Sequence, residues 1–512
     1  MKNKQLTLVV VSLLVVVLSV SLAYFTAQII GNGKDVSVTS TNLQIVFTDT
    51  DGEIAGADIE PGWQKTKTFT VQNNSKSEYK YNIVIKDLVN TFVTNGYLKY
   101  KITSTNNGYN MTEFKDIPKS SVATDTILAY SVVIPNGVTQ SYTIEFKYVN
   151  DESVDQSDDM GRKLSGTLFI TEGTEDIYAG YEEGTLGYQI MGDNPTRDTR
   201  NTYNAIFINN TAGTLFTATE KNVHNTTDTT VYYYAGNTTN NWVKFAGFYW
   251  RIIRTNADGS VRMLYSGTEA EGTTGTNGMI NTSTAFNEIY EDPMYVGYMY
   301  GTSGNLINNR TNTTNSTIKG KIDTWYIQNM TSYTKYLSTT AVYCNDRNLR
   351  SGDTYTTSTS TSFYYAPYAR VNTNYAPTYD CTEANDAFSG SNTSAKLTYP
   401  IALMTADEIM RAGGKGGTSL TSPYAWYYLN SANGSITGST WWWLLSPNGW
   451  TGSRADMFRV YGSSLPGYLN NSGVRYTSGV RPALSLKACV KYSTGDGSAS
   501  APYTIKETTS GC

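Results

Sequence analysis

The stretch WVKFAGFYWRIIRTNADGSVRMLY, residues 242–265, decides the fold of the C-terminal part of this chain. It contains two apolar segments, residues 242–254 and 261–265, separated by the turn sequence Ala257-Asp258-Gly259. Asp-Gly between two apolar strands is a strong signal for a β-hairpin. The stretch therefore predicts a hairpin of two strands.

Two helices are predicted further along the chain. Residues 316–330 carry Ile318, Ile322 and Tyr326 at helical spacing. A second helix begins at residue 405, where Thr-x-x-Glu forms a capping box, and Gly413 follows as its C-terminal cap. Five of the nine tryptophans lie between residues 426 and 450, so burial or binding concentrates there.

Residues 35–172 are predicted to form a separate β-sandwich. The predicted strands are short and regularly spaced, with turn signals such as Pro61-Gly62 and Pro135-Asn136-Gly137 between them. An acidic, Gly-rich linker is expected at residues 173–186, followed by a second domain at 187–506. The predicted fold class is therefore mostly β with some α.

The N-terminus predicts export. Lys2 and Lys4 precede an uncharged apolar run from Leu6 to about Phe25. The small residues of Ser21-Leu22-Ala23 favour a cleaved signal peptide, whereas the length of the run suits a retained membrane anchor. Residues 1–30 are therefore either a signal or an anchor. In both cases the rest of the chain lies outside the cytoplasm, at the cell surface or secreted.

Composition excludes one class of partner and favours another. The net charge of −4 gives no basic field for nucleic acid. Charged residues make up only 16% of the 512 residues, while the chain has 41 tyrosines. Tyrosine offers a large contact area at low entropic cost, although it is also a good strand former.

Four cysteines fit an oxidising environment, where an even count indicates disulfides. Their order in the sequence predicts the pairs Cys344–Cys381 and Cys489–Cys512. His224 is the only histidine, so zinc sites and histidine-based nucleophilic sites lack their parts. The acidic run at residues 49–53 lacks the remaining ligands of a calcium loop. We expect no metal and no cofactor.

The first domain resembles the TasA/camelysin group of secreted proteins. The resemblance covers roughly residues 1–172 and is carried by Ala23-Tyr24-Phe25-Thr26-Ala27, Leu43-Gln44-Ile45, Ile59-Glu60-Pro61-Gly62 and Gln72-Asn73-Asn74. It implies a SipW-type signal and a β-sandwich, and some members of the group build extracellular fibres. Because the domain precedes a larger one here, a stalk or spacer is the plainer role.

The second domain resembles an uncharacterised bacterial surface domain with the C-type-lectin fold of the formylglycine-generating enzyme type. The marks are WVKFAGFYWRIIR (242–254), YCNDR (343–347), YPIALMTADE (399–408), WWLLSP (442–447) and GVRPALSL (479–486). In ligand-binding proteins with this fold, the segment between the Trp-rich strand and the final Val-Arg-Pro strand displays the binding face. Here that segment is residues 448–478.

The candidate residues divide into three groups. Arg481 is expected to pair with a carboxylate, and Asp407 and Glu408 are expected to cap and charge the start of a helix. The candidate core is Trp443, Leu445, Phe458, Val460 and Val480. The candidate ligand-binding set contains aromatic, arginine and amide side chains suited to binding contacts: Trp450, Arg454, Asp456, Arg459, Tyr461, Tyr468, Asn470, Asn471 and Tyr476.

These features predict a cell-surface ligand-binding or adhesion protein rather than an enzyme. Its partner would be an extracellular protein or a glycan, and it would contact the membrane only through an uncleaved N-terminal segment. One alternative is a structural subunit of an extracellular fibre or biofilm matrix. Another is a formylglycine-generating-type oxidase, which uses a nearby cysteine pair with copper; a structural disulfide suits Cys344 and Cys381 better.

Overall fold

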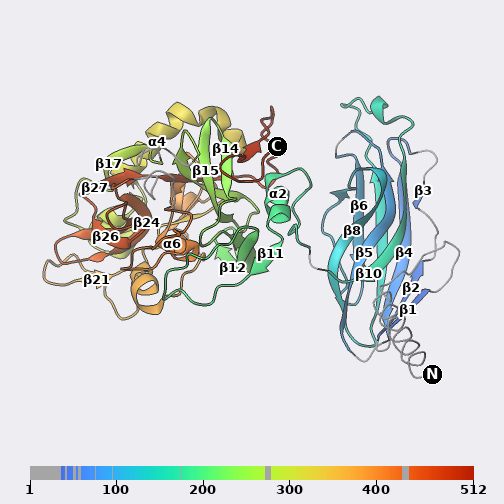
Figure 1. Cartoon of the computed structure of the whole chain (residues 1–512), viewed down its shortest axis with the longest axis horizontal. Helices are drawn as coiled ribbons and strands as arrows, with labels where there is room; N and C mark the ends of the chain where they lie inside the picture. The colour runs from blue at the N-terminus through green and yellow to red at the C-terminus, as the bar shows by residue number, and fades with distance from the viewer. Residues whose placement is uncertain are drawn as a thin grey trace, which may run out of the picture. The chain divides into compact units, whose positions relative to one another are not determined.

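The computed structural model describes residues 36–40, 43–49, 54–55, 59–74, 77–94, 96–174, 176–270, 278–428 and 438–512 (Figure 1). The chain divides into two compact units between Asp176 and Ile177. The described residues are mostly β with some helix, as the sequence predicts.

Part of the sequence prediction falls outside these ranges. The signal or anchor at residues 1–30 lies outside the described residues, as do positions 50–53 of the acidic run. In the part of the chain that the structure describes, no helix has the length and apolar character needed to cross a membrane.

The first unit contains two antiparallel sheets, of six strands in the order β1-β2-β4-β9-β6-β7 and of four in the order β3-β10-β5-β8 (Figure 1). The strands and their bounds are β1 (Val36–Ser40), β2 (Leu43–Asp49), β3 (Ile54–Ala55), β4 (Gln64–Asn73), β5 (Tyr79–Asn90), β6 (Leu98–Ser104), β7 (Lys115–Asp116), β8 (Ser120–Ile134), β9 (Thr139–Tyr148) and β10 (Leu164–Glu172).

Alternation along each strand explains why the two sheets pack face to face. In β4, Phe69 and Val71 are buried, while Thr68 before them is exposed and Thr70 between them is half-buried. Together with Ile83 from the other sheet and Ile144 of β9, they belong to one buried apolar cluster. Burying each such side chain stabilises the fold by about 1.5–3 kcal/mol relative to leaving it exposed. The unit is therefore a β-sandwich.

The second unit is built on a ten-stranded sheet and a six-stranded sheet, with short helices around them. Its main elements are α2 (Leu186–Asp193), β11 (Thr196–Asp198), β12 (Thr214–Asn222), β13 (Asn225–Tyr233), β14 (Trp242–Phe245), β15 (Phe248–Thr255), β16 (Val261–Gly267), β17 (Asn281–Ala285), β18 (Met299–Tyr300), α3 (Leu306–Asn309), β19 (Thr314–Asn315), α4 (Thr317–Asn329), β20 (Tyr343–Cys344), β21 (Phe363–Tyr364), α5 (Ala366–Ala369), β22 (Ala387–Phe388), β23 (Ile401–Leu403), α6 (Ala406–Ala412), β24 (Trp442–Trp450), β25 (Ala455–Val460), β26 (Leu469–Gly473), β27 (Thr477–Val480), β28 (Pro482–Leu486), β29 (Tyr492–Thr494) and β30 (Tyr503–Ile505).

The hairpin predicted over residues 242–265 has one more turn than expected. Strands β15 and β16 pair antiparallel across the Asp-Gly turn, as expected. The single strand predicted at residues 242–254 is instead two strands, β14 and β15, which pair with each other. Ala246 and Gly247 join them with φ values of 54° and 78°. Positive φ at both central residues defines the turn that suits the twist of a tight hairpin.

Both predicted helices are present. Helix α4 begins after Ser316, whose side chain accepts a hydrogen bond from the backbone N–H of Lys319. Helix α6 has the predicted capping box between Thr405 and Glu408, and Gly413 ends it with a φ of 124°. The five candidate core residues are all at most 1% exposed, so that prediction is confirmed.

The cysteines pair as the sequence order predicts. One disulfide joins Cys344 to Cys381 and the other joins Cys489 to Cys512, with Cα–Cα distances of 5.8 Å and 5.3 Å.

Candidate functional site

The predicted binding segment, residues 448–478, forms the end of β24, the strands β25 and β26, and the start of β27. Its nine candidate residues do not share one surface. Tyr476 is exposed, and Arg454, Tyr461, Tyr468, Asn470 and Asn471 are half-buried. Trp450, Asp456 and Arg459 are buried.

Trp450 belongs to the core, which corrects the expectation of an exposed side chain. It is 1% exposed, and its indole Nε1 donates a hydrogen bond to the carbonyl oxygen of Ser358 at 3.1 Å. Phe363 of β21 pairs with it across the sheet. The segment that covers Trp450 lies about ninety positions earlier in the chain, so local sequence gave no sign of this contact.

Asp456 and its neighbours form a closed polar group. The Asp456 carboxylate accepts hydrogen bonds from Arg454 Nε at 2.6 Å and from Asn471 Nδ2 at 2.7 Å. Because the carboxylate is 1% exposed and already paired, these contacts hold β25 and β26 together. The carboxylate oxygens of Asp456 are therefore not free to bind a ligand.

The remaining candidates gather with a residue that the prediction omitted. Trp441 stacks on Tyr461 with ring centroids 4.0 Å apart, and Tyr461 meets Tyr468 edge-on at 5.3 Å. The Arg459 guanidinium lies over the Trp441 ring at 3.5 Å. We call these four residues the aromatic–arginine cluster. All except Arg459 are half-buried, so the cluster reaches the surface.

Strand periodicity could have identified Trp441. Arg459 of β25 and Tyr461, which directly follows this strand, are two residues apart, and side chains two apart in an extended chain lie on the same face. Arg459 pairs with Trp443 of β24. Trp441 is two residues before Trp443, so it lies on the same face and next to Tyr461. The pattern was obscured because three tryptophans follow each other at 441–443.

Arg459 has an unusual environment for a buried cation. It is 6% exposed, and its Nη1 donates a hydrogen bond to Ser478 Oγ at 3.2 Å. Its Nε has no hydrogen-bond partner among the described residues. Burial lowers the pKa of the Arg459 guanidinium, because removing the charge from water is costly.

Arg481 satisfies its charge differently from the prediction. Its hydrogen bonds within the described residues go to Ser266 Oγ and to the carbonyl oxygens of Tyr265, Gly278 and Tyr427 rather than to a carboxylate. The guanidinium also lies 4.8 Å from the centroid of a tryptophan ring of β24. Burial lowers its pKa to about 9. Carbonyl dipoles therefore replace the expected ion pair.

The sequence marks of the second unit converge on one polar cleft. Glu408 accepts from Arg254 Nε at 3.0 Å and from Arg262 Nη1 at 2.8 Å. Asp407 lies in the first turn of α6, as expected, and its carboxylate also accepts a hydrogen bond from Arg370 Nε at 2.6 Å. The cleft encloses a cavity of about 20 Å³ with the following lining: Arg254, Arg262, Val342, Cys344, Asp346, Arg370, Thr378, Tyr379, Asp380, Thr405, Asp407, Glu408 and Ser446.

The electrostatics of the cleft indicate a structural role. Burial raises the pKa of Glu408, but Arg262 and Arg254 outweigh burial, and the net pKa is below the usual value. A cavity of this size holds about one water molecule. The network thus joins β15, β16 and α6 through paired charges, with little room for a ligand.

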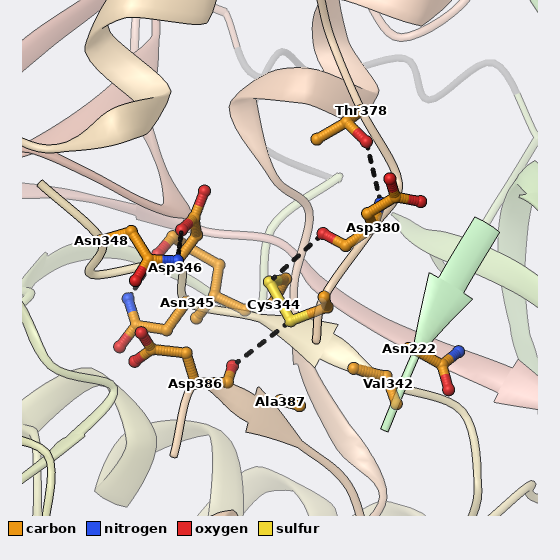
Figure 2. Close-up of a disulfide and its surroundings, with 12 residues drawn as sticks. Asn222, Val342, Cys344, Asn345, Asp346, Asn348, Thr378, Asp380, Asp386 and Ala387 are labelled. Atoms are coloured by element: carbon orange, nitrogen blue, oxygen red, sulfur yellow. Dashed lines mark hydrogen bonds between the residues drawn. A yellow bond between two sulfur atoms is a disulfide. The ribbon is translucent and has the colours of Figure 1, made fainter. Parts of the chain in front are cut away.

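Cys344, which lines this cavity, forms a disulfide with Cys381 (Figure 2). Beside it, Asp380 donates its backbone N–H to Thr378 Oγ1 at 3.0 Å. The disulfide connects β20 to the segment that carries Thr378 and Tyr379. Both sulfur atoms are used in the disulfide, which agrees with the structural role expected for this pair.

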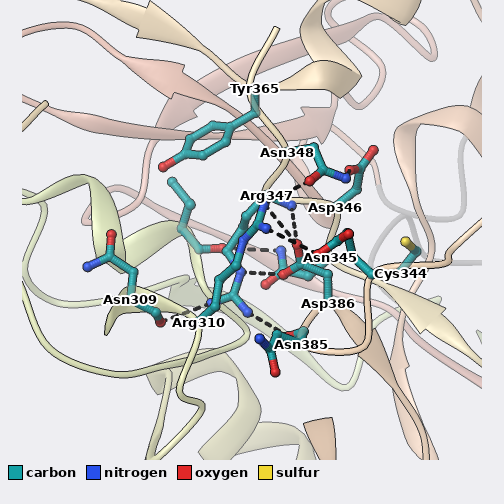
Figure 3. Close-up of polar contacts among 12 residues, drawn as sticks. Asn309, Arg310, Cys344, Asn345, Asp346, Arg347, Asn348, Tyr365, Asn385 and Asp386 are labelled. Carbon is teal, nitrogen blue, oxygen red and sulfur yellow. Dashed lines mark hydrogen bonds and ion pairs between the residues drawn. The ribbon is translucent and has the colours of Figure 1, made fainter. Parts of the chain in front are cut away.

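Arg347, the last residue of the YCNDR segment, makes several polar contacts that fix this segment (Figure 3). Its Nε donates to Asp386 Oδ1 at 2.5 Å, and its Nη2 donates to Asn312 Oδ1 and the Asn385 carbonyl, both at 2.9 Å. Arg347 is 1% exposed and Asp386 is fully buried. Such a pair, with its other donors satisfied, fixes geometry rather than binding a partner.

Two further observations limit the chemistry. Across the described ranges, no group of three or more His, Cys, Asp or Glu side chains is placed to hold a metal ion. A shallow hollow of about 300 Å³ on the first unit is lined by threonine and serine of β4, β6 and β9, together with Phe69 and Tyr142. No charged side chain occurs in its described lining.

Comparison with known proteins gives little help. No family model matches the chain, and no curated protein matches it significantly. Among solved structures, the crystal structure of a ruminal GH26 endo-beta-1,4-mannanase is similar at 14% sequence identity over 28% of each chain. The TM-score of that match is 0.15, so it supports no inference about fold or activity.

Proposed function

We propose that this chain is an exported bacterial surface protein that binds an extracellular protein or glycan through its second unit. The observation that carries the proposal is the aromatic–arginine cluster, which reaches the surface just before β24 and in the connection between β25 and β26. Tryptophan, tyrosine and arginine are the residue types that dominate binding energy at interfaces. The first unit serves as the stalk or spacer that carries this binding head.

The location outside the cytoplasm has independent support. Two disulfides suit an oxidising compartment. The basic residues and apolar run at the N-terminus suit export. A low fraction of charged residues and many tyrosines suit a surface that makes neutral and aromatic contacts.

A binding screen tests the proposal. The exported protein, as the cell processes it, would be applied to a glycan array and to a panel of extracellular proteins. We expect a ligand whose binding is lost when Tyr461 and Tyr468 are both changed to alanine. A ligand whose binding survives this change, and depends instead on the first unit, would contradict the proposal.

A further inference from the structure

Arg459 differs from the other buried arginines described above. Arg254, Arg262 and Arg347 each pair with a carboxylate at 3.0 Å or less. Arg481 donates to several carbonyl oxygens. A guanidinium has five N–H donors, and an unpaired buried charge is costly. Among the described residues, Arg459 donates to Ser478 Oγ and interacts with the Tyr461 hydroxyl, whereas its Nε–H has no partner.

The acid on the same strand, Asp456, is paired with another arginine and influences Arg459 only through its electric field. Asp456 is paired with Arg454, at 2.6 Å and 3.0 Å between the two pairs of atoms. Positions 456 and 459 are three apart in β25, so their side chains point to opposite faces of the sheet. The guanidinium thus retains an orphaned Nε–H that is buried inside the cluster.

The surroundings of this donor define what could fill the site. Trp441 and Tyr461 lie within 3.5 Å and 5.2 Å of the guanidinium, measured to their ring centroids. Asn470 pairs with Arg459 across β25 and β26 and adds an amide beside it. The site combines one planar cation, a half-exposed aromatic wall and one neutral polar group.

We propose that Arg459 recognises the carboxylate of an acidic sugar whose ring lies against Trp441, Tyr461 and Tyr468. Guanidinium groups bind carboxylates through two parallel hydrogen bonds. The C–H face of a pyranose is apolar and flat, and it matches an aromatic wall better than a flexible acidic side chain does. This inference rests on the proposed function and names its ligand class.

Ligands of matched shape test the charge requirement directly. The exported protein would be titrated with methyl glucuronide, with methyl galacturonide and with two neutral analogues, methyl glucoside and the methyl ester of methyl glucuronide. Saturation-transfer NMR reports binding of each. We expect the acids to bind at least tenfold more tightly than the neutral analogues. Equal binding of acid and ester, or no binding of either acid, would overturn the inference.

A variant identifies the residue. Arg459→Gln should abolish the preference for the acids, whereas Arg475→Gln, a change at an exposed arginine that pairs with Glu291 at 3.6 Å, should preserve it. If Arg459→Gln does not fold, the comparison of acid with ester in the unaltered protein still decides the question.

Two outcomes separate this inference from the proposed function. A glutamate-rich peptide that binds while the acidic sugars do not would overturn the inference and keep the function. So would a neutral ligand whose binding is lost in the Tyr461→Ala, Tyr468→Ala protein. If no screened ligand depends on the cluster, both the inference and the proposed function are wrong.

Discussion

Glu408 holds two arginine side chains at once and caps its own helix. One carboxylate oxygen accepts from Arg254 and Arg262, and the other accepts from the backbone N–H of Thr405. Glu220 also pairs with Arg254 at 2.6 Å, and all four side chains of the ion group are at most 3% exposed. Removing one partner from such a group leaves charges that are buried and uncompensated.

Glu408→Gln should therefore lower the free energy of unfolding by roughly 3–5 kcal/mol. The pKa of Glu408 is below its usual value in the folded protein, so its contribution is present above the unfolded pKa and is lost as pH falls through the folded pKa. Denaturant unfolding over a pH series checks this. The difference between the two proteins should shrink in acid, and Glu383→Gln, at a half-exposed carboxylate, should have little effect. A constant difference across pH would contradict the explanation.

Trp450→Ala should also unfold more easily, because a fully buried indole leaves a cavity. We expect a loss of about 3–5 kcal/mol, similar to Trp443→Ala. Thermal and denaturant melts of both variants measure it. A Trp450→Ala protein as stable as the wild type would show that residues 358–364 do not pack over the indole of Trp450.

At the scale of elements, periodicity and turn chemistry allowed most of the predictions. The capping box at Thr405 and the spacing of Ile318 and Ile322 predicted both helices because these signals are local. The strand at residues 242–254 was predicted too long. Ala246-Gly247 forms the extra turn there. Alanine rarely takes a positive φ, so its presence did not indicate a turn.

The binding set could be predicted only in part, because segments distant in sequence bury some of its members. Arg459 and Tyr461 are two residues apart, so the sequence places them on one face of an extended chain, and the structure brings Tyr468 beside Tyr461. Trp450 and Asp456 are buried by segments distant in sequence, residues 358–364 and the neighbouring strand β26. Sequence alone shows which residues could make contacts, whereas burial by a distant segment decides which remain accessible.

The disulfide between Cys344 and Cys381 links two walls of the polar cleft. Replacing both cysteines with serine should lower the free energy of unfolding by roughly 3–4 kcal/mol on the chain-entropy model, given a separation of 37 residues. Peptide mapping under non-reducing conditions and melts of the variant measure the pairing and its effect. Free thiols at these positions in the exported protein would contradict the assignment and favour an oxidase.

At the scale of the whole molecule, the first unit has a core of its own. A fragment of residues 32–172 should therefore fold alone, with a β-type circular dichroism spectrum and a cooperative melt. A sandwich of this size buries enough apolar surface for independent stability. A helical or unfolded spectrum would show that the sandwich needs the rest of the chain.

The central claim is that the aromatic–arginine cluster binds a ligand rather than holding the fold together. The measurement that tests it most directly compares stability and binding in the Tyr461→Ala, Tyr468→Ala protein. Half-exposed side chains contribute little to stability, whereas aromatic hot spots contribute about 2 kcal/mol or more each to binding. We predict a melting temperature close to that of the wild type together with loss of binding to the screened ligand. A protein that unfolds, or one that keeps its full affinity, would contradict the claim.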